Sequence, residues 1–289
     1  MKRLTGSIVA IAGAATLVAL AAIPAAGHPS TLLGVPRAAA EGQSSTLLRL
    51  RQAAAQGQAP AGRALPRTAD GKPDFSGIWE VVSKANYNIE PHSASRGVPA
   101  GAGVVEGGEL PYRPEALEKR KQNYANRKAA DTEGKCFLPG VPRVMYFEHP
   151  FQIVQTPGLV MMLFEYLHAT RNVFMNTPHL EGPLDFWMGD SRGTWDGDTL
   201  TVDANNFNEE TWFDRAGNHH SDQLHVIERY TLTDADHIAY TATIEDSKVF
   251  TRPWTMNLVF YRHTEPNFRL LDYECYAFAL DDVPIVPTK

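Results

Sequence analysis

Residues Gln223–Glu245 read QLHVIERYTLTDADHIAYTATIE, two runs of alternating apolar and polar residues joined by a polar turn. Side chains on a β-strand point alternately to its two faces, so this pattern predicts two antiparallel strands with one buried face. The more apolar faces consist of Leu224, Val226, Glu228, Tyr230, Ile238, Tyr240, Ala242 and Ile244. We therefore expect Glu228 to point inward, while His225 and Arg229 point outward.

The same pattern continues through most of the chain after Cys136. Turn residues at Pro157-Gly158 and Asp196-Gly197-Asp198 separate strand-like runs, which is typical of hairpins. The further runs are FQIVQT, LVMMLFEYL, GTW, TLTVDA, TMNLVFYRH and RLLDYECYAF. None of them alternates with a helical segment of ten or more residues, which argues against parallel βαβ units. The expected fold is mostly β, an antiparallel meander that closes into a barrel or a sandwich.

The N-terminus has the order of a secretory signal peptide, with Lys2 and Arg3, an apolar run, and then small residues. We place the signal peptide at 1–26, so the mature protein is predicted to be periplasmic or secreted, with no membrane span after signal removal. Residues 27–67 are rich in Ala, Gln, Ser and Pro, which favours a flexible tether. Residues 68–289 then form a single domain with a loop and helix insertion at about 84–143.

The insertion contains a Gly-, Pro- and Ser-rich loop over 86–109, followed by YRPEALEKRKQNYANRKAAD. Pro114 suits the first position of a helix, so this segment is predicted to be a peripheral helix. Its basic cluster, Lys119-Arg120-Lys121, is interpreted as a solvated face. One or two peripheral helices are expected in all.

Charge and motifs exclude several classes of function. The chain of 289 residues has a net charge of −6, and an acidic protein without a basic block repels phosphate backbones, so no nucleic-acid partner is expected. There is no G-x-S-x-G, no G-x-G-x-x-G and no P-loop, so we expect no nucleotide cofactor and assign no cofactor. Cys136 and Cys275 are the only cysteines, and in an oxidising compartment a disulfide between them is the simplest outcome.

The stretch NHHSDQLHVIERY, residues 218–230, raises the alternative of a metal site formed by His219, His220 and His225. A three-histidine zinc site prefers histidines on one face of a strand or at helical spacing. His220 and His225 are five residues apart and fall on opposite faces of an extended strand. A metal site would therefore need another ligand, and a strand with a polar rim explains most of the stretch.

The segment Phe75-Ser76-Gly77-Ile78-Trp79 resembles the G-x-W signature of the first strand of lipocalins and other calycins. This resemblance implies a lipocalin/calycin-like β-barrel in which an arginine from a late strand, Arg262 or Arg252, stacks on the tryptophan. The chain departs from that family in its length, in the insertion of about seventy residues after the first strand, and in a second G-x-W at Gly193–Trp195.

A more extensive resemblance is to a large group of secreted, mostly uncharacterised bacterial proteins with a GKPDFSGIW-type start. It covers nearly all of 72–275, and the recurring phrases include CFLPGVPR, PFQIVQTPG, DFWMGDSRGTWDGDTLTVD and IEDSKVFTRPW. It implies an extracytoplasmic location and a β architecture, but no reaction.

The first functional hypothesis is a protein that binds a small hydrophobic or aromatic molecule in the barrel cavity. Apolar walls with a few placed polar groups are typical of such pockets. The candidate ligand-binding residues are Arg171, Asp185, Tyr230, Tyr240, Arg252 and Trp254.

The alternative is a cofactor-free lyase, hydratase, isomerase or hydrolase acting on such a molecule. A histidine near a carboxylate can act as a general acid or base at neutral pH. The candidate catalytic residues are His168, Glu165, His220 and Glu228.

Overall fold

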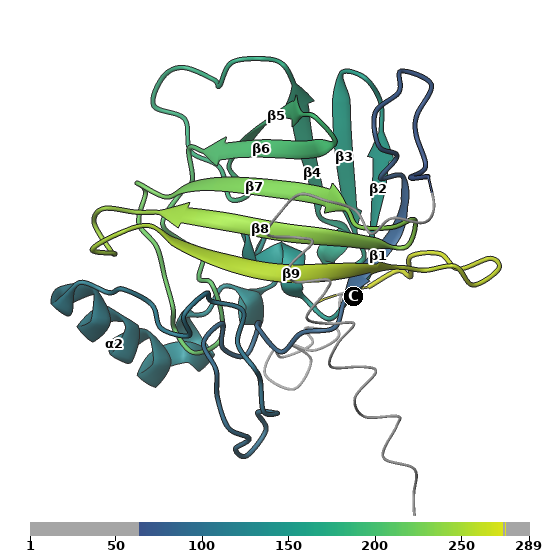
Figure 1. Ribbon diagram of the computed structural model, residues 1–289. Helices are drawn as coiled ribbons and strands as arrows, with labels where there is room; N and C mark the ends of the chain where they lie inside the picture. Colours follow the sequence, from purple (N-terminus) through teal and green to yellow (C-terminus); the bar gives the residue numbers. More distant parts are fainter. Residues whose placement is uncertain (1–63, 274, 276–289) are drawn as a thin grey trace, which may run out of the picture. The chain divides into compact units, whose positions relative to one another are not determined.

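The alternating runs form a closed barrel of nine strands in the computed structural model, which describes residues 64–273 and 275 (Figure 1). The strands are β1 (Gly77–Val81), β2 (Phe151–Gln155), β3 (Leu159–Phe164), β4 (Thr170–Met175), β5 (Asp190–Asp196), β6 (Thr199–Asn205), β7 (His225–Leu232), β8 (His237–Glu245) and β9 (Trp254–Arg262). Strand β1 pairs with both β2 and β9, so no strand edge is left open along the wall. The prediction of a mostly β, calycin-like barrel is confirmed.

Two details of the meander differ from expectation. Strands β4 and β5 pair in parallel, because residues 176–189 carry the chain back across the barrel end before β5 begins. The predicted last strand is also wrong over its described part, since Arg269–Tyr273 is not in a strand. Strand β9 is already paired with β8 and β1, so the barrel offers no further edge to which this segment could add.

One end of the barrel is closed by the arginine and tryptophan that the lipocalin resemblance predicted. The Arg262 guanidinium lies 4.1 Å from the centre of the fully buried Trp79 ring. Arg262 also donates to the carbonyl oxygens of Ser76, at 2.5 Å, and Ala235, at 2.8 Å. Gly77 has a φ of +140°, and a Cβ at this position would collide with the Arg262 guanidinium. Glycine is therefore required beside the stacked pair.

The inward and outward faces of β7 are as predicted, since Val226, Glu228 and Tyr230 are fully buried. The interior, however, is filled by polar side chains that satisfy one another. Arg171 on β4 forms an ion pair with Glu228 on β7, and both side chains are almost completely buried. The hydroxyls of Tyr230 and Tyr240 donate to Glu228 Oε1 at 2.8 and 3.0 Å. The partner of Glu228 is thus Arg171.

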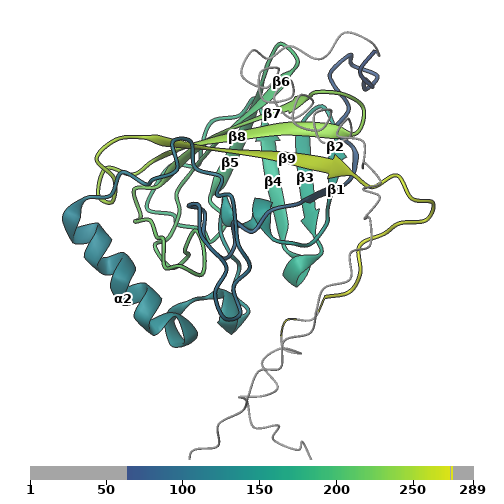
Figure 2. The ribbon, with the colours of Figure 1, turned by 60° about the horizontal axis from the view of Figure 1, so that its bottom comes forward.

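The predicted insertion lies between β1 and β2 and contains the single α-helix of the described chain, α2 (Pro114–Ala130), with Pro114 at its start as expected. Three 3₁₀ turns complete the helical content: η1 (Glu133–Lys135), η2 (Arg143–Tyr146) and η3 (Tyr166–His168). Turn η2 is completely buried, and its Met145 Sδ lies 3.9 Å from the Tyr230 hydroxyl. Helix α2 lies outside the barrel wall, beside the loops of the insertion (Figures 1 and 2).

Residues 1–26 were predicted to be a signal peptide and 27–67 a tether. Of these, 1–63 lie outside the described residues. Every described residue belongs to the second of two compact units, Ser44–Lys289. Arg67, placed in the tether from sequence, belongs to the folded part, because it bridges to Pro73 and pairs with Asp198 at 2.7 Å. Within residues 64–273, no helix is long and apolar enough to span a bilayer.

The predicted disulfide between Cys136 and Cys275 is confirmed, and it links residues 139 positions apart. It connects the insertion to the segment that follows β9. An intramolecular disulfide of this kind is typical of proteins that fold outside the cytoplasm.

Candidate functional site

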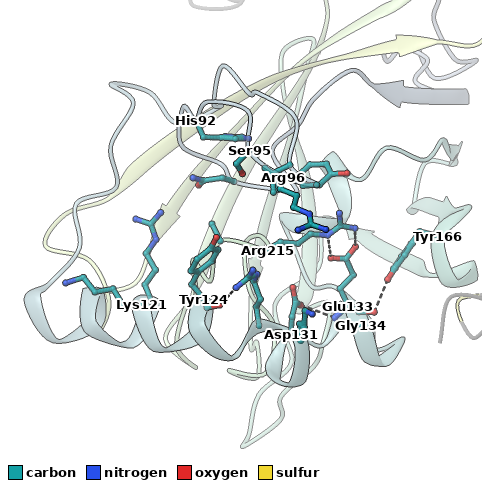
Figure 3. Close-up of a pocket in the computed structure, with 18 of the residues that line it drawn as sticks. His92, Ser95, Arg96, Lys121, Tyr124, Asp131, Glu133, Gly134, Tyr166 and Arg215 are labelled. Carbon is teal, nitrogen blue, oxygen red and sulfur yellow. Dashed lines mark hydrogen bonds and ion pairs between the residues drawn. The ribbon is translucent and has the colours of Figure 1, made fainter. Parts of the chain in front are cut away.

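A cleft of about 1090 Å³ lies between α2 and the loop of residues 92–98 (the 92–98 loop), outside the barrel (Figure 3). Its walls come from seven separate parts of the sequence: the 92–98 loop with Tyr87 and Asn88, one face of α2, turn η1 with Cys136, His149, Tyr166, the 215–216 loop, and Tyr273 with Cys275. A smaller space of about 460 Å³ lies beside Glu165 and Phe268, also outside the barrel. Concave sites of this size are where small molecules bind to proteins.

The floor of the cleft is fixed by a buried network around Arg143. This arginine is 1% exposed, and its guanidinium donates to Asp131 Oδ1 at 2.8 Å, to Glu133 Oε2 at 2.7 Å and to Asn86 Oδ1 at 2.9 Å. Arg215 reaches the other side of Glu133 at 2.5 Å. Burial alone raises the pKa of Glu133, but the two arginines outweigh that effect and hold this pKa below its usual value. These ion pairs and hydrogen bonds hold turn η1 at the end of α2.

The walls of the cleft are strongly cationic, although the whole chain is acidic. Some of these cations have an acid close by. The ion pairs are Arg120–Glu90 (2.8 Å), Lys121–Glu118 (2.6 Å) and Arg215–Glu133 (2.5 Å). Three other lining cations, Arg96, Arg127 and Lys128, have no acidic partner among the described residues.

The end of the cleft near the disulfide is aromatic. His149 packs between two tyrosines, with ring-centre distances of 4.7 Å to Tyr273 and 5.8 Å to Tyr166. Behind it, Glu165 Oε1 lies 3.4 Å from His149 Nδ1, and Glu165 Oε2 accepts the Leu271 amide at 2.8 Å. A carboxylate in this position favours the tautomer that carries a proton on Nδ1, which leaves Nε2 as the basic nitrogen.

Four of the predicted site residues lie together inside the barrel and not in the cleft. These are Arg171, Glu228, Tyr230 and Tyr240, each of which is at most 2% exposed. Arg171 also donates to the Ser191 hydroxyl at 2.9 Å, so its remaining N–H groups are occupied. Burial and the neighbouring charge of Glu228 raise the pKa of both tyrosines well above the usual value, which keeps them neutral. Their arrangement is that of a satisfied buried network.

The three histidines considered as metal ligands do not share a site. His225 lies on the outer face of β7, with its Nε2 2.8 Å from Asp203. His219 is stacked on Tyr112, and burial lowers its pKa to about 4. Among the described residues there is no group of three or more His, Cys, Asp or Glu that is arranged to hold a metal ion. The geometry therefore does not support the metal-binding alternative.

His220 was predicted to be a catalytic acid or base. Its Nδ1 lies 2.9 Å from the Ser221 carbonyl oxygen, an acceptor, so Nδ1 carries the proton. Its Nε2 then accepts from the Thr211 hydroxyl at 2.7 Å. Both ring nitrogens are occupied and the side chain is buried, so the ring acts as a structural link between two loops.

None of the remaining predicted residues lines the cleft. Asp185, Arg252 and His168 are exposed, and Arg252 donates to the carbonyl oxygen of Pro253 at 3.2 Å. Trp254 is buried, in contact with Phe213 and Phe250, and its indole nitrogen has no hydrogen-bond partner. Of the predicted catalytic residues, only Glu165 lies next to the cleft, through its contact with His149.

Sequence reasoning missed the residues that form the cleft. The basic cluster on α2 was interpreted as a solvated face, yet Arg120 and Lys121 line the cleft. Tyr124, on the same helix, is 50% exposed and also lines the cleft. The signal that was present is the combination of bases and tyrosine along one helix of an otherwise acidic chain.

Comparison with known proteins adds no assignment: no family model matches the sequence, and no curated protein matches it significantly.

Proposed function

We propose that this protein is an extracytoplasmic binding protein for a small aromatic or apolar molecule. The cleft beside α2 is the binding site, and the barrel is the scaffold that supports it. The observation that carries the proposal is the cleft itself, about 1090 Å³ in volume, with tyrosine and histidine rings at its walls, among them the exposed Tyr124. Aromatic rings offer a large contact area at low conformational cost, which suits recognition of another flat, apolar group.

The location agrees with the sequence and with the disulfide. Residues 1–26 have the order of a signal peptide, and the Cys136–Cys275 bond is stable where thiols are oxidised. Membership in the group of secreted bacterial proteins with a GKPDFSGIW-type start is part of the same proposal. Such a group would then share a barrel whose insertion carries the site.

The test uses N-phenyl-1-naphthylamine, a neutral dye that fluoresces when it leaves water, and a variant that blocks the cleft. Gly134 lines the cleft, and a Cβ at this position meets no atom within 4 Å. We expect Gly134→Trp to occupy the cleft and weaken dye binding at least tenfold. The matched control is Gly158→Trp, in the β2–β3 turn, where a Cβ also meets open space. Absence of saturable binding, or equal affinity in Gly134→Trp and the wild type, would overturn the proposal.

A second candidate function, an enzyme acting on the same molecules, is favoured by the contact of His149 with Glu165. A histidine oriented by a carboxylate and facing a cleft is suited to take a proton from water. The test substrate is p-nitrophenyl benzoate: His149 would take a proton from the water that attacks the ester carbonyl, which yields benzoate and p-nitrophenol. We expect His149→Ala to abolish this hydrolysis while weakening dye binding less than Gly134→Trp does, whereas His237→Ala, on the outer barrel surface, changes neither. Equal rates in His149→Ala and the wild type would eliminate this candidate.

A further inference from the structure

The cations of the cleft separate into two classes when each is matched to its nearest acids. Arg120, Lys121 and Arg215 are each neutralised by a glutamate within 2.8 Å. The two carboxylates of the floor, Asp131 and Glu133, are themselves fully engaged by Arg143 and Arg215. Among the described residues, no carboxylate that lines the cleft therefore remains to pair with the other cations.

Arg96, Arg127 and Lys128 form the unmatched class. Arg127 donates to the Tyr124 carbonyl oxygen at 2.8 Å and lies 4.2 Å from the centre of the Tyr124 ring, but it contacts no carboxylate. Arg127 and Lys128 stand in the last turn of α2, where the partial negative charge of the helix end accounts for part of their placement. That account does not extend to Arg96, which comes from the 92–98 loop on the opposite wall.

Figure 3 shows Arg96 reaching from the 92–98 loop toward the pair formed by Arg215 and Glu133, with α2 on the other side of the cleft. Like charges on facing walls repel each other, and the repulsion is stronger in a concave site than in open water. An anion placed between the walls removes this cost and accepts hydrogen bonds from both sides. Guanidinium groups bind carboxylates and similar oxyanions with well-defined geometry.

The aromatic end of the cleft lies beyond the floor, at His149, Tyr166 and Tyr273. One molecule that uses both ends must carry an acidic group and an aromatic or apolar body. We infer that the cleft recognises a small aromatic acid, whose anionic group is held by Arg96, Arg127 and Lys128; this inference rests on the proposed function.

The test compares two dyes that share one aromatic skeleton. N-phenyl-1-naphthylamine is neutral, whereas 8-anilinonaphthalene-1-sulfonate carries an added sulfonate. We expect the anionic dye to bind the wild-type protein at least tenfold more tightly than the neutral dye at low ionic strength. Because the added affinity is electrostatic, the difference should shrink as salt is raised. Gly134→Trp should weaken binding of both dyes.

Arg96→Glu is the deciding variant, and Arg252→Glu is its control. Both arginines are exposed and neither has an acidic partner among the described residues, but only Arg96 lines the cleft. Arg96→Glu should weaken binding of the anionic dye at least tenfold and change the affinity for the neutral dye less than twofold. Arg252→Glu should alter neither affinity. Near-ultraviolet circular dichroism checks that both variants keep the wild-type fold.

The outcomes separate the two claims. If both dyes bind equally and Arg96→Glu changes neither affinity, the anionic ligand class is wrong and the binding site stands. If neither dye binds saturably, or if Gly134→Trp leaves both affinities unchanged, the proposed function fails and the inference fails with it.

Discussion

Arg171 and Glu228 face each other across the interior of the barrel, one on β4 and the other on β7, and Arg171 Nη1 lies 2.9 Å from Glu228 Oε1. These strands are not neighbours in the wall, so the ion pair joins two separate parts of the sheet. Burial disfavours the charged form of Arg171, but the charge and hydrogen bonds of Glu228 outweigh this and raise its pKa. The centre of the barrel thus contains a paired cation and anion and is filled by side chains.

Replacing Glu228 with Gln should be strongly destabilising. The change leaves the Arg171 cation buried without a counter-charge, and breaking a buried pair in this way costs about 3–5 kcal/mol. Urea unfolding measures the loss. The double variant Arg171→Met/Glu228→Leu removes both charges and should lose less stability than Glu228→Gln alone. Glu245→Gln, an exposed acid on β8, is the control and should change stability by less than about 1 kcal/mol.

Asp214 should make stability depend on pH. Burial raises the pKa of its carboxyl group to about 6, although hydrogen bonds from Asn218 and the Ile89 amide oppose this. The folded pKa then lies above the unfolded value of about 4, so the folded protein holds the proton more tightly. Stability falls as pH rises between these two values, by on the order of 3 kcal/mol from this group.

The variant Asp214→Asn isolates this effect, because it removes the titration and leaves the other acids in place. Its unfolding free energy at pH 4 and pH 7, measured by denaturant titration, should lack the decrease that Asp214 contributes to the wild type. Asn keeps only one of the two oxygens of Asp214, so the variant loses the acceptor either for the Ile89 amide or for the Ala216 amide and should be less stable at both values of pH. An identical pH slope in the two proteins would contradict the raised pKa.

Gly77→Ala should disturb the closed end of the barrel. The residue has a φ of +140° and its Cβ would displace Arg262 from Trp79, so a loss of about 1–3 kcal/mol is expected. Thermal unfolding measures the loss, and a shift in tryptophan emission reports the exposure of Trp79. Gly158→Ala, with open space at its Cβ, serves as the comparison and should be nearly neutral.

Removing the disulfide should weaken both the fold and the cleft. A loop closed by residues 139 apart contributes roughly 5 kcal/mol at most in the chain-entropy model, so Cys136→Ser/Cys275→Ser should lose up to that amount. Both cysteines and Tyr273 line the cleft, so the affinity for N-phenyl-1-naphthylamine should fall as well. A reducing agent should reproduce the loss in the wild type and have no effect on the double variant.

The barrel could be predicted from the sequence because the alternation of apolar and polar residues along a strand depends only on neighbouring residues. Alternation over β7, β8 and β9 reports directly which residues face inward. The Gly77–Trp79 signature predicted the first strand and left two candidates for its arginine partner, of which the structure shows Arg262. The parallel pairing of β4 with β5 was not predictable in this way, because it depends on where a fourteen-residue connection returns the chain. Alternation fixes the face of a strand but not its neighbour.

The cleft could not be predicted for a different reason. Its walls combine segments as distant as Tyr87 and Cys275, and no short motif brings them together. The alternation of inward and outward positions placed Glu228 and the tyrosines correctly inside the barrel. Whether a barrel interior is hollow, however, depends on the size and pairing of all its side chains. Arg171, from a strand that the sequence pattern did not reveal, is the residue that fills it.

The point at which the insertion leaves and rejoins the barrel has a practical meaning. Trp79 on β1 is paired directly with Phe151 on β2, so residues 82–150 depart from and return to adjacent positions in the sheet. A segment anchored at such closely spaced ends can be exchanged as a unit, provided that the replacement keeps the buried turn η2 and Cys136, which contact the rest of the chain. Grafting insertions from related chains onto this one host should therefore transplant their ligand preferences while the host continues to fold.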